Sequence, residues 1–118
     1  KIDNLEILNG LIAGAEGGTV EFKETTGQLE RGMETLCAFL NGTGGTVLFG
    51  VTDKGKIIGN TDIPGTNKSV IALSAEEQRY MRPFTYKGRA YQRIESVTSA
   101  MPQGIYNLLV MQRGGTYA

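Results

Sequence analysis

The chain has 118 residues, 40% of them apolar and 20% charged, with equal numbers of acidic and basic side chains. This size suits one domain with one modest core, and the composition is typical of a soluble globular protein. The sequence contains no histidine, which excludes Ser-His and Cys-His catalysis and the usual zinc ligand sets. No apolar run is long enough to cross a bilayer. The lone cysteine, Cys37, lies among apolar helix residues, which favours a buried structural thiol over a nucleophile and a reducing, cytoplasmic location.

Charge is unevenly distributed along the chain. Residues 1–36 carry three basic side chains against seven acidic ones, whereas residues 68–95 carry six basic against three acidic. A net charge of zero argues against strong nonspecific binding of a polyanion, but a basic segment is the pattern of a surface that attracts one. The second half is therefore where nucleic-acid contacts are expected.

Three segments of the first half predict regular elements. Apolar residues spaced three or four apart over residues 4–13 predict a helix, with Asp3 or Asn4 as its cap. Alternation of apolar and polar residues over residues 19–23 predicts a half-buried strand. The near-continuous apolar run at residues 45–51 predicts a central strand that is covered on both faces.

The main helix is predicted over residues 28–40. Gly32 costs about 1 kcal/mol inside a helix, so we expect it to permit a close contact. Gly42 is expected to end the helix in the left-handed conformation. Glu30 and Glu34 are expected to point outward. The predicted apolar face consists of Leu29, Met33, Leu36, Cys37 and Leu40.

The second half is predicted to add strands and a closing helix. A glycine turn after the central strand leads back along residues 56–59 as a hairpin strand. Further strands are expected at residues 69–73 and 87–94, and a helix at residues 105–111. With the first half, these elements predict a single α+β domain over residues 1–118, in which the main helix packs on a mixed β-sheet.

Residues 79–93 interleave cations with aromatic side chains. Cations pair with phosphates, and aromatic rings stack on exposed bases. In a strand over residues 87–94, alternate side chains point to the same side, and the side that includes Ile94 is expected to face the core. The side chains of the other side then form a solvent-facing stripe. This stripe is either a nucleic-acid contact or an ordinary cationic strand face without a ligand. This predicted stripe consists of Lys87, Arg89, Tyr91 and Arg93.

The glycine-rich segment at residues 41–46 has two interpretations. It invites phosphate binding, but it follows a helix and precedes a strand, the reverse of the order that aims a helix N-terminus at phosphate. It also lacks the Gly-Lys-Ser/Thr ending of a P-loop. A structural turn is therefore favoured over a nucleotide-binding loop, and no cofactor is predicted.

Three carboxylates form a second candidate site. Glu16 and Glu21 lie on either side of a glycine pair, and Asp53 lies at the tip of the predicted hairpin. If they converge on one side of the sheet, they suit Mg²⁺ or Mn²⁺ and the activation of water against a phosphodiester. The alternative is that they are solvated charges at a strand end.

Several pieces of the chain, taken in order, resemble one family. The ordered set resembles the Schlafen/AlbA-like domain family, whose members are described as DNA-binding domains of bacterial transcriptional regulators and frequently carry a further C-terminal region. The resemblance implies an N-terminal module of a longer bacterial protein. Some members carry an ATP-binding label, which the missing P-loop does not support. The matching pieces are residues 16–23, 37–41, 44–51, 53–59 and 88–93, with Ser96 and Thr98 following.

Schlafen relatives include RNA-cleaving enzymes that use a carboxylate cluster. By resemblance, their paired glutamates correspond to Glu16 and Glu21, and we assign the third acid to Asp53. The family also places a helix and part of a strand where this chain has a short link at residues 60–67. Either this chain has lost that helix, or a loop is missing near residues 59–66. We favour the missing loop, because a short link would leave one sheet face uncovered.

These observations favour a nucleic-acid-binding domain of a transcriptional regulator, with DNA or RNA as its partner. The first alternative is a metal-dependent nuclease that holds Mg²⁺ or Mn²⁺ on the three carboxylates. The second is an interaction module that forms a homodimer or binds another protein. In the favoured interpretation, phosphate contacts are assigned to Arg82, Lys87, Arg89 and Arg93, and stacking on bases is assigned to Tyr86 and Tyr91.

Overall fold

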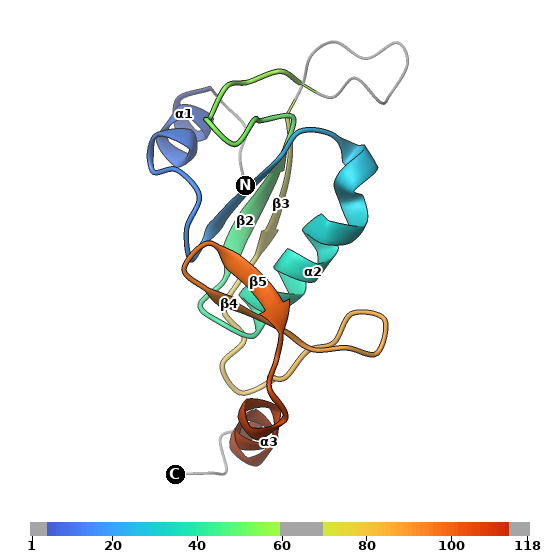
Figure 1. Ribbon diagram of the computed structural model, residues 1–118. Helices are drawn as coiled ribbons and strands as arrows, with labels where there is room; N and C mark the ends of the chain where they lie inside the picture. Colours follow the sequence, from blue (N-terminus) through green and yellow to red (C-terminus); the bar gives the residue numbers. More distant parts are fainter. Residues whose placement is uncertain (1–4, 60–69, 114–118) are drawn as a thin grey trace.

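The structure is a computed structural model that describes residues 5–59 and 70–113, and its element order confirms the predicted α+β class (Figure 1). The first half forms two helices and two strands, and the second half adds three strands and a helix. In chain order the elements are α1 (Leu5–Ala13), β1 (Val20–Lys23), the short 3-10 helix η1 (Thr26–Gln28), α2 (Leu29–Leu40), β2 (Gly45–Phe49), β3 (Ile71–Ala75), β4 (Tyr91–Ile94), β5 (Val97–Ala100) and α3 (Gln103–Gln112).

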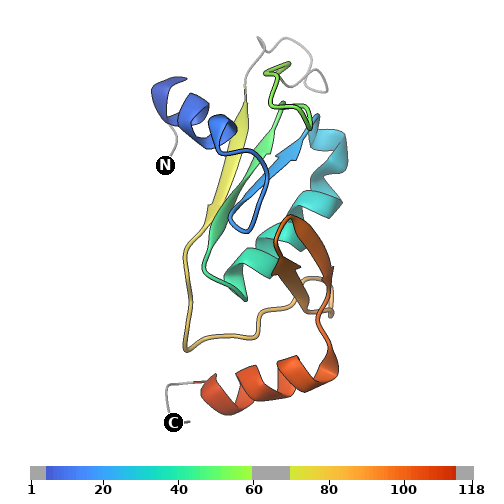
Figure 2. The same ribbon diagram turned by 60° about the vertical axis from the view of Figure 1, so that its left-hand side comes forward.

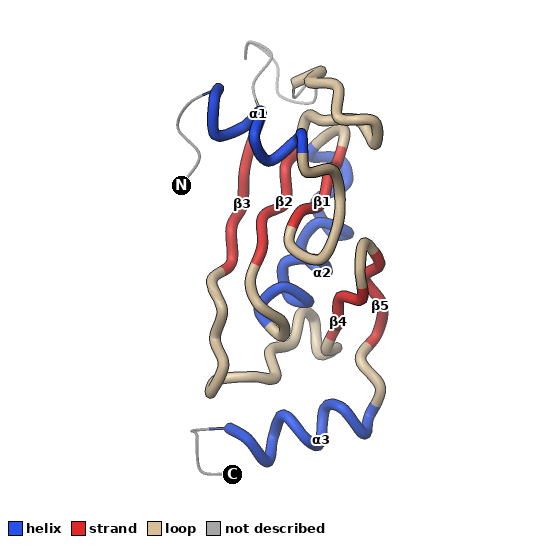
Figure 3. Tube along the Cα trace, turned by 90° about the vertical axis from the view of Figure 1, so that its left-hand side faces the viewer, coloured by secondary structure: helices blue, strands red, loops and turns tan. Residues whose placement is uncertain are grey.

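A three-stranded mixed sheet forms the centre of the fold, in the order β1-β2-β3. β1 pairs with β2 in parallel and places Phe22 opposite Leu48, while β3 pairs with β2 antiparallel and places Leu73 opposite Val47. Figures 2 and 3 show α1 on one face of this sheet and α2 on the other. β2 is therefore central and covered on both faces, as its apolar run predicts.

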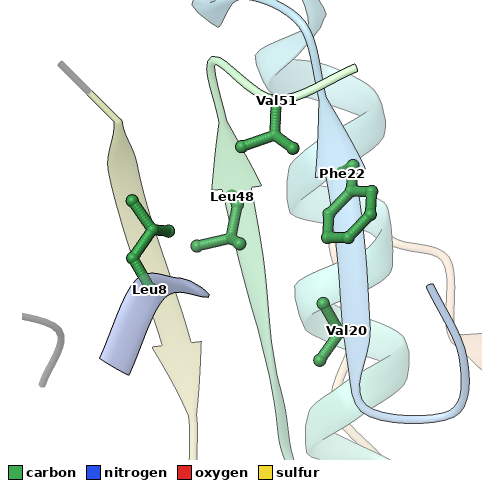
Figure 4. Close-up of a cluster of buried hydrophobic side chains, with 5 residues drawn as sticks. All are labelled: Leu8, Val20, Phe22, Leu48 and Val51. Carbon is green, nitrogen blue, oxygen red and sulfur yellow. The ribbon is translucent and has the colours of Figure 1, made fainter. Parts of the chain in front are cut away.

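The face of the sheet under α1 has its own core, drawn in Figure 4. Alternate residues of a strand point to the same side, so Val20 and Phe22 of β1 join Leu48 of β2 on this face. α1 contributes Leu8, and Val51 closes the cluster beyond the end of β2. The prediction that a short link after β2 leaves one sheet face uncovered is therefore wrong, because α1 covers it. The link and the missing loop expected with it lie outside the described residues.

The opposite face of the sheet packs against α2 through Leu36, Phe39, Val47 and Phe49. Burying each of these side chains stabilises the fold by about 1.5–3 kcal/mol. Gly32 confirms its predicted role, because a Cβ there would lie 2.5 Å from Phe49 Cζ.

The predicted apolar face of α2 is only partly correct. Leu29 is 47% exposed, whereas Gly32 and Thr35 are buried. The helix is covered on two sides, by the sheet and by the β4–β5 hairpin, and the hairpin buries positions that a single apolar stripe does not include. The residues of α2 that are buried are Gly32, Thr35, Leu36, Cys37, Ala38 and Phe39.

The turns that flank β2 also differ from prediction in one place. The left-handed glycine after α2 is Gly44, with φ 89°, and not Gly42. A Cβ on Gly44 would lie 2.6 Å from the carbonyl oxygen of Ala75, so both the conformation and the space require glycine. After β2, Gly55 has φ 83° and confirms the predicted turn. The expected return strand is reduced to one bridge, between Val51 and Ile57.

The remaining elements lie beside α2 and below it. β3 occurs two residues later than predicted, and the hairpin of β4 and β5 is a separate antiparallel pair that packs against α2. α3 confirms the predicted closing helix and has no buried residue. Within residues 5–59 and 70–113, no helix is long and apolar enough to cross a membrane.

Candidate nucleic-acid interface

The predicted cationic strand face does not exist, because β4 begins only at Tyr91. Upstream of it, Tyr86 and Arg89 pair across a tight turn, in which Lys87 and Gly88 have φ 51° and φ 76°. Positive φ at both central residues is the geometry of a two-residue hairpin turn. Lys87 and Arg89 therefore belong to this turn and not to a strand. Ile94, predicted to face the core, is 60% exposed.

The side chain of Arg93 is buried in the fold, with only 3% of it exposed. Its Nη1 lies 2.8 Å from Glu21 Oε1, and its guanidinium stacks 5.3 Å from the centre of the Phe39 ring. Its Nε donates to Gly17 O and its Nη2 to Val20 O. These contacts join the hairpin to β1 and use the donors that a phosphate would need, so its predicted place on a solvent-facing stripe is wrong.

The side chains of Tyr86 and Lys87 are engaged by α2. Tyr86 Oη donates to Glu30 Oε2 at 2.7 Å, and Lys87 forms an ion pair with Glu30 Oε1. The hydrogen bond from Lys87 lowers the pKa of Glu30, and the same bond raises the pKa of Lys87. Tyr91 reaches the next acidic residue of the helix, Glu34, with 3.3 Å between its Oη and Oε2. The acidic face of α2 therefore neutralises Lys87 and holds the hydroxyl groups of Tyr86 and Tyr91.

Three arginines differ from Lys87 and Arg93, which are paired with glutamates. Arg79, Arg82 and Arg89 have no ion pair within the described residues. Arg79 and Arg82 line a cleft of about 500 Å³ together with Gln112 at the end of α3. Tyr80, which is 54% exposed, completes its wall. Arg82 Nη1 donates to Asn41 O at 3.3 Å, while its buried Nε has no hydrogen-bond partner among the described residues.

Arg89 lines a second and larger cleft, of about 710 Å³, at the other end of α3. Gln103 and Tyr106, from the first turns of α3, face it together with Thr85. We call this cleft and the previous one the arginine clefts. Neither is lined by an acidic residue. Their remaining lining residues are Gly88, Ala90, Ala100 and Met101, all in the larger cleft.

The arginine clefts contain residues that the sequence analysis missed. Tyr80 lies inside the cation-rich segment, and its neighbours Arg79 and Arg82 are a signal that could have identified it. Gln103, Tyr106 and Gln112 carry no such signal, because only the position of α3 in space brings them to the arginines (Figure 2).

Glu16 and Glu21 of the second candidate site are engaged by the fold, whereas the third carboxylate, Asp53, is exposed. Glu16 Oε1 accepts a hydrogen bond from Phe22 N at 2.7 Å. Burial raises the pKa of Glu16, and repulsion by Glu21 and Asp53 adds to that shift. Among the described residues, no group of three or more His, Cys, Asp or Glu side chains is arranged to hold a metal ion.

Glu21 lies in a small polar pocket of about 180 Å³ between β1, α2 and the hairpin. Its carboxylate is paired with Lys23 at 3.0 Å as well as with Arg93, and all three side chains line the pocket. Two cations already compensate this buried charge, so a metal ion there would have to displace them.

Cys37 confirms the prediction of a buried thiol. Its Sγ donates to Phe84 O at 3.4 Å, and burial raises the pKa of the thiol. A raised pKa disfavours the thiolate, which is the reactive form of cysteine. The structure therefore supports a packing role for Cys37 at the contact between α2 and the loop that precedes β4.

A sheet between two helices, with a hairpin on the second helix, defines this as an α+β domain, in which the arginine clefts lie at the two ends of α3. Residues 16–69, just under half of the chain, match the family model described as Schlafen, AlbA_2. The resemblance predicted from the sequence is confirmed over this segment, which begins before β1 and extends past β2. The match indicates a nucleic-acid-related domain. No curated protein and no solved structure matches the chain.

Proposed function

We propose that this domain binds nucleic acid, DNA or RNA, through the arginine clefts, as the N-terminal module of a longer transcriptional regulator in the bacterial cytoplasm. The observation that carries the proposal is that arginines line two clefts together with a tyrosine, exposed Tyr80 in one and half-buried Tyr106 in the other, and that no carboxylate lines either cleft. Elsewhere in the described residues, Arg31, Lys87 and Arg93 are each paired with a glutamate.

The chemistry of the clefts suits a phosphate backbone. A guanidinium presents several donors in a plane and matches a phosphate with two parallel hydrogen bonds. Arg79 and Arg82 line one cleft, and the exposed ring of Tyr80 beside them offers a face on which a base stacks. Arg89 provides a phosphate contact in the other cleft.

Three of the predicted contact residues remain in this proposal with a reduced role. Lys87 is 67% exposed and reaches a phosphate only in competition with Glu30. Tyr86 and Tyr91 stack on a base only if they give up their bonds to the helix glutamates. We therefore expect smaller effects from these three residues than from the arginines of the clefts.

The test is fluorescence anisotropy with labelled single- and double-stranded DNA and RNA over a salt series. Arg79→Glu and Arg89→Glu each alter one of the arginine clefts. Lys54→Glu is the matched control, because Lys54 is exposed in the turn after β2. This turn lies at the far end of the molecule from α3 (Figure 1). We expect the slope of log affinity against log salt to fall by about one for each lost phosphate contact. An equal loss in the control, or no salt-sensitive binding by the native protein, contradicts the proposal.

A metal-dependent nuclease is the second candidate, because the bond from Phe22 N holds Glu16 against β1, the strand that carries Glu21. The test is cleavage of RNA and DNA with and without Mg²⁺ or Mn²⁺, followed on a gel. Asp53→Asn is the best variant because Asp53 is exposed, whereas Glu21→Gln also breaks the buried pair with Arg93. Cleavage that needs metal and is lost in Asp53→Asn supports this candidate. Intact products in all conditions rule it out.

A further inference from the structure

The two edges of the central sheet differ in whether their outward backbone groups have hydrogen-bond partners among the described residues. At the β1 edge, the outward N–H of Phe22 is bonded to Glu16 Oε1. The outward carbonyl of Val20 accepts from both Gly17 N and Arg93 Nη2. This edge is therefore closed by side chains and by the loop before the strand. At the opposite edge, β3 has no such contact among the described residues.

The register identifies the open groups of β3. Thr46 N donates to Thr19 O of the segment that leads into β1, so the alternate residues Gly45, Val47 and Phe49 turn their backbone groups toward β3. Their partners across the antiparallel ladder are Ala75, Leu73 and Ile71. The residues between, Ala72 and Ser74, therefore point their N–H and C=O groups away from β2. β3 forms the edge of the sheet on this side (Figure 3).

β3 also lacks the features that usually protect an edge strand. Natural edges carry lysine, proline, an inward charge or a bulge that prevents pairing with another chain. The sequence of β3, Ile-Ala-Leu-Ser-Ala, contains no charge and no proline, and its register with β2 is continuous over all five residues. Unpaired backbone groups of this kind form a ready template for another strand.

We propose that β3 pairs with β3 of a second copy of this chain, antiparallel, about a two-fold axis at Leu73. This register places Ala72 opposite Ser74 of the other copy. Each such pair exchanges two hydrogen bonds, so the two symmetric pairs satisfy the N–H and C=O groups that the single chain leaves open. The two three-stranded sheets then become one six-stranded sheet.

A second copy fits this edge better than an unrelated strand because the edge is self-complementary. At the two-fold axis Leu73 meets Leu73 of the other copy, on the face where it already packs against the α2 core. No like charges face each other within the paired residues, since β3 carries none. Glu76 and Glu77, which follow the strand, lie at opposite ends of the paired region in the two copies.

The first test measures mass and amide hydrogen exchange of the whole chain over about a hundredfold range of protein concentration. We expect the mass to double at high concentration and the amides of Ala72 and Ser74 to become protected with it. The amides of Ile71 and Leu73 serve as the internal control, because β2 protects them in the single chain. A monomer at all concentrations, or a dimer in which Ala72 and Ser74 still exchange rapidly, overturns the proposal.

The second test changes the edge itself. Ser74→Pro removes one outward N–H without removing a bond to β2, and proline is tolerated at such edge positions. Ser74→Ala is the matched control, since it loses the hydroxyl bond to Thr46 but keeps the N–H. We expect a monomer from the first variant and a dimer from the second. If a folded Ser74→Pro variant dimerises as strongly as the Ser74→Ala control, the proposal is contradicted. If the Ser74→Pro variant does not fold, the exchange experiment on the native chain decides.

Discussion

Two sets of arginines in this domain, close together in sequence, have different surroundings. Arg93 is buried against Glu21 and the Phe39 ring, and its donors are satisfied by the fold. Arg79, Arg82 and Arg89 line clefts that contain no carboxylate. The comparison teaches that a cation in a basic segment is available to a ligand only where tertiary structure has left it without an acidic partner.

The largest expected effect is at the buried member of this comparison. Arg93→Met leaves the carboxylate of Glu21 buried beside Lys23 alone, and breaking a buried pair in this way costs about 3–5 kcal/mol. Urea unfolding followed by circular dichroism measures the loss. Arg89→Met is the control, because an exposed side chain without an ion pair changes stability by about 0.5 kcal/mol or less. If Arg93→Met and Arg89→Met are equally stable, the proposed difference between the buried arginine and the arginines of the clefts is wrong.

The next effect concerns Asn41, which connects α2 to the loop that carries Arg82. Its Nδ2 donates to Phe84 O and Tyr91 O, and its Oδ1 accepts from Phe84 N. Asn41→Ala removes the side-chain partner of Phe84 N and Tyr91 O and leaves Phe84 O with the bond from Cys37 Sγ, at a cost of about 2–4 kcal/mol in unfolding free energy. We also expect weaker nucleic-acid binding, because the loop loses its attachment. Full binding by a destabilised Asn41→Ala variant would show that the attachment does not position Arg82.

A smaller effect, of opposite sign, is expected at the acidic face of α2. Glu30→Gln removes the charge that pairs with Lys87 and leaves that lysine able to meet a phosphate. The affinity for nucleic acid should rise, and the salt slope should steepen by up to about one contact. Anisotropy over a salt series measures both. Glu24→Gln is the control for charge alone, since Glu24 is exposed and outside α2. An equal rise in both variants would assign the effect to net charge.

The smallest effect is the pH dependence of Glu16. Its pKa in the folded protein is raised above 4.5, mainly by burial, so the folded state binds the proton more tightly than the unfolded chain. Stability from this group is therefore lost as pH rises through the raised pKa. Glu16→Gln keeps the acceptor for Phe22 N and should be more stable than the native chain at neutral pH. Its advantage should disappear in urea unfolding at a pH below 4.5, and an advantage that persists there would assign it to another cause.

Local sequence patterns predicted most of the fold. The helical spacing of α1 and the apolar run of β2 were predicted correctly, because each depends on residues close together in the chain. The close contact expected at Gly32 was also correct, although its partner, Phe49, lies in β2. The closing helix α3 was also predicted, although its apolar residues Ile105 and Leu108 turned out to be exposed. The predicted cationic strand failed at Lys87, where a two-residue turn replaces the first part of the strand.

The candidate site was less predictable, because it depends on contacts between residues far apart in sequence. Arg93 meets Val20 across 73 positions and Tyr86 meets Glu30 across 56, and no local pattern reports such partners. The sequence by itself determined which segments form helices and strands and which half of the chain is basic, since period and charge are local properties. Only the tertiary structure decided which arginines are paired, which edge of the sheet is closed and where α3 completes a cleft, because desolvation and pairing arise when distant segments come together.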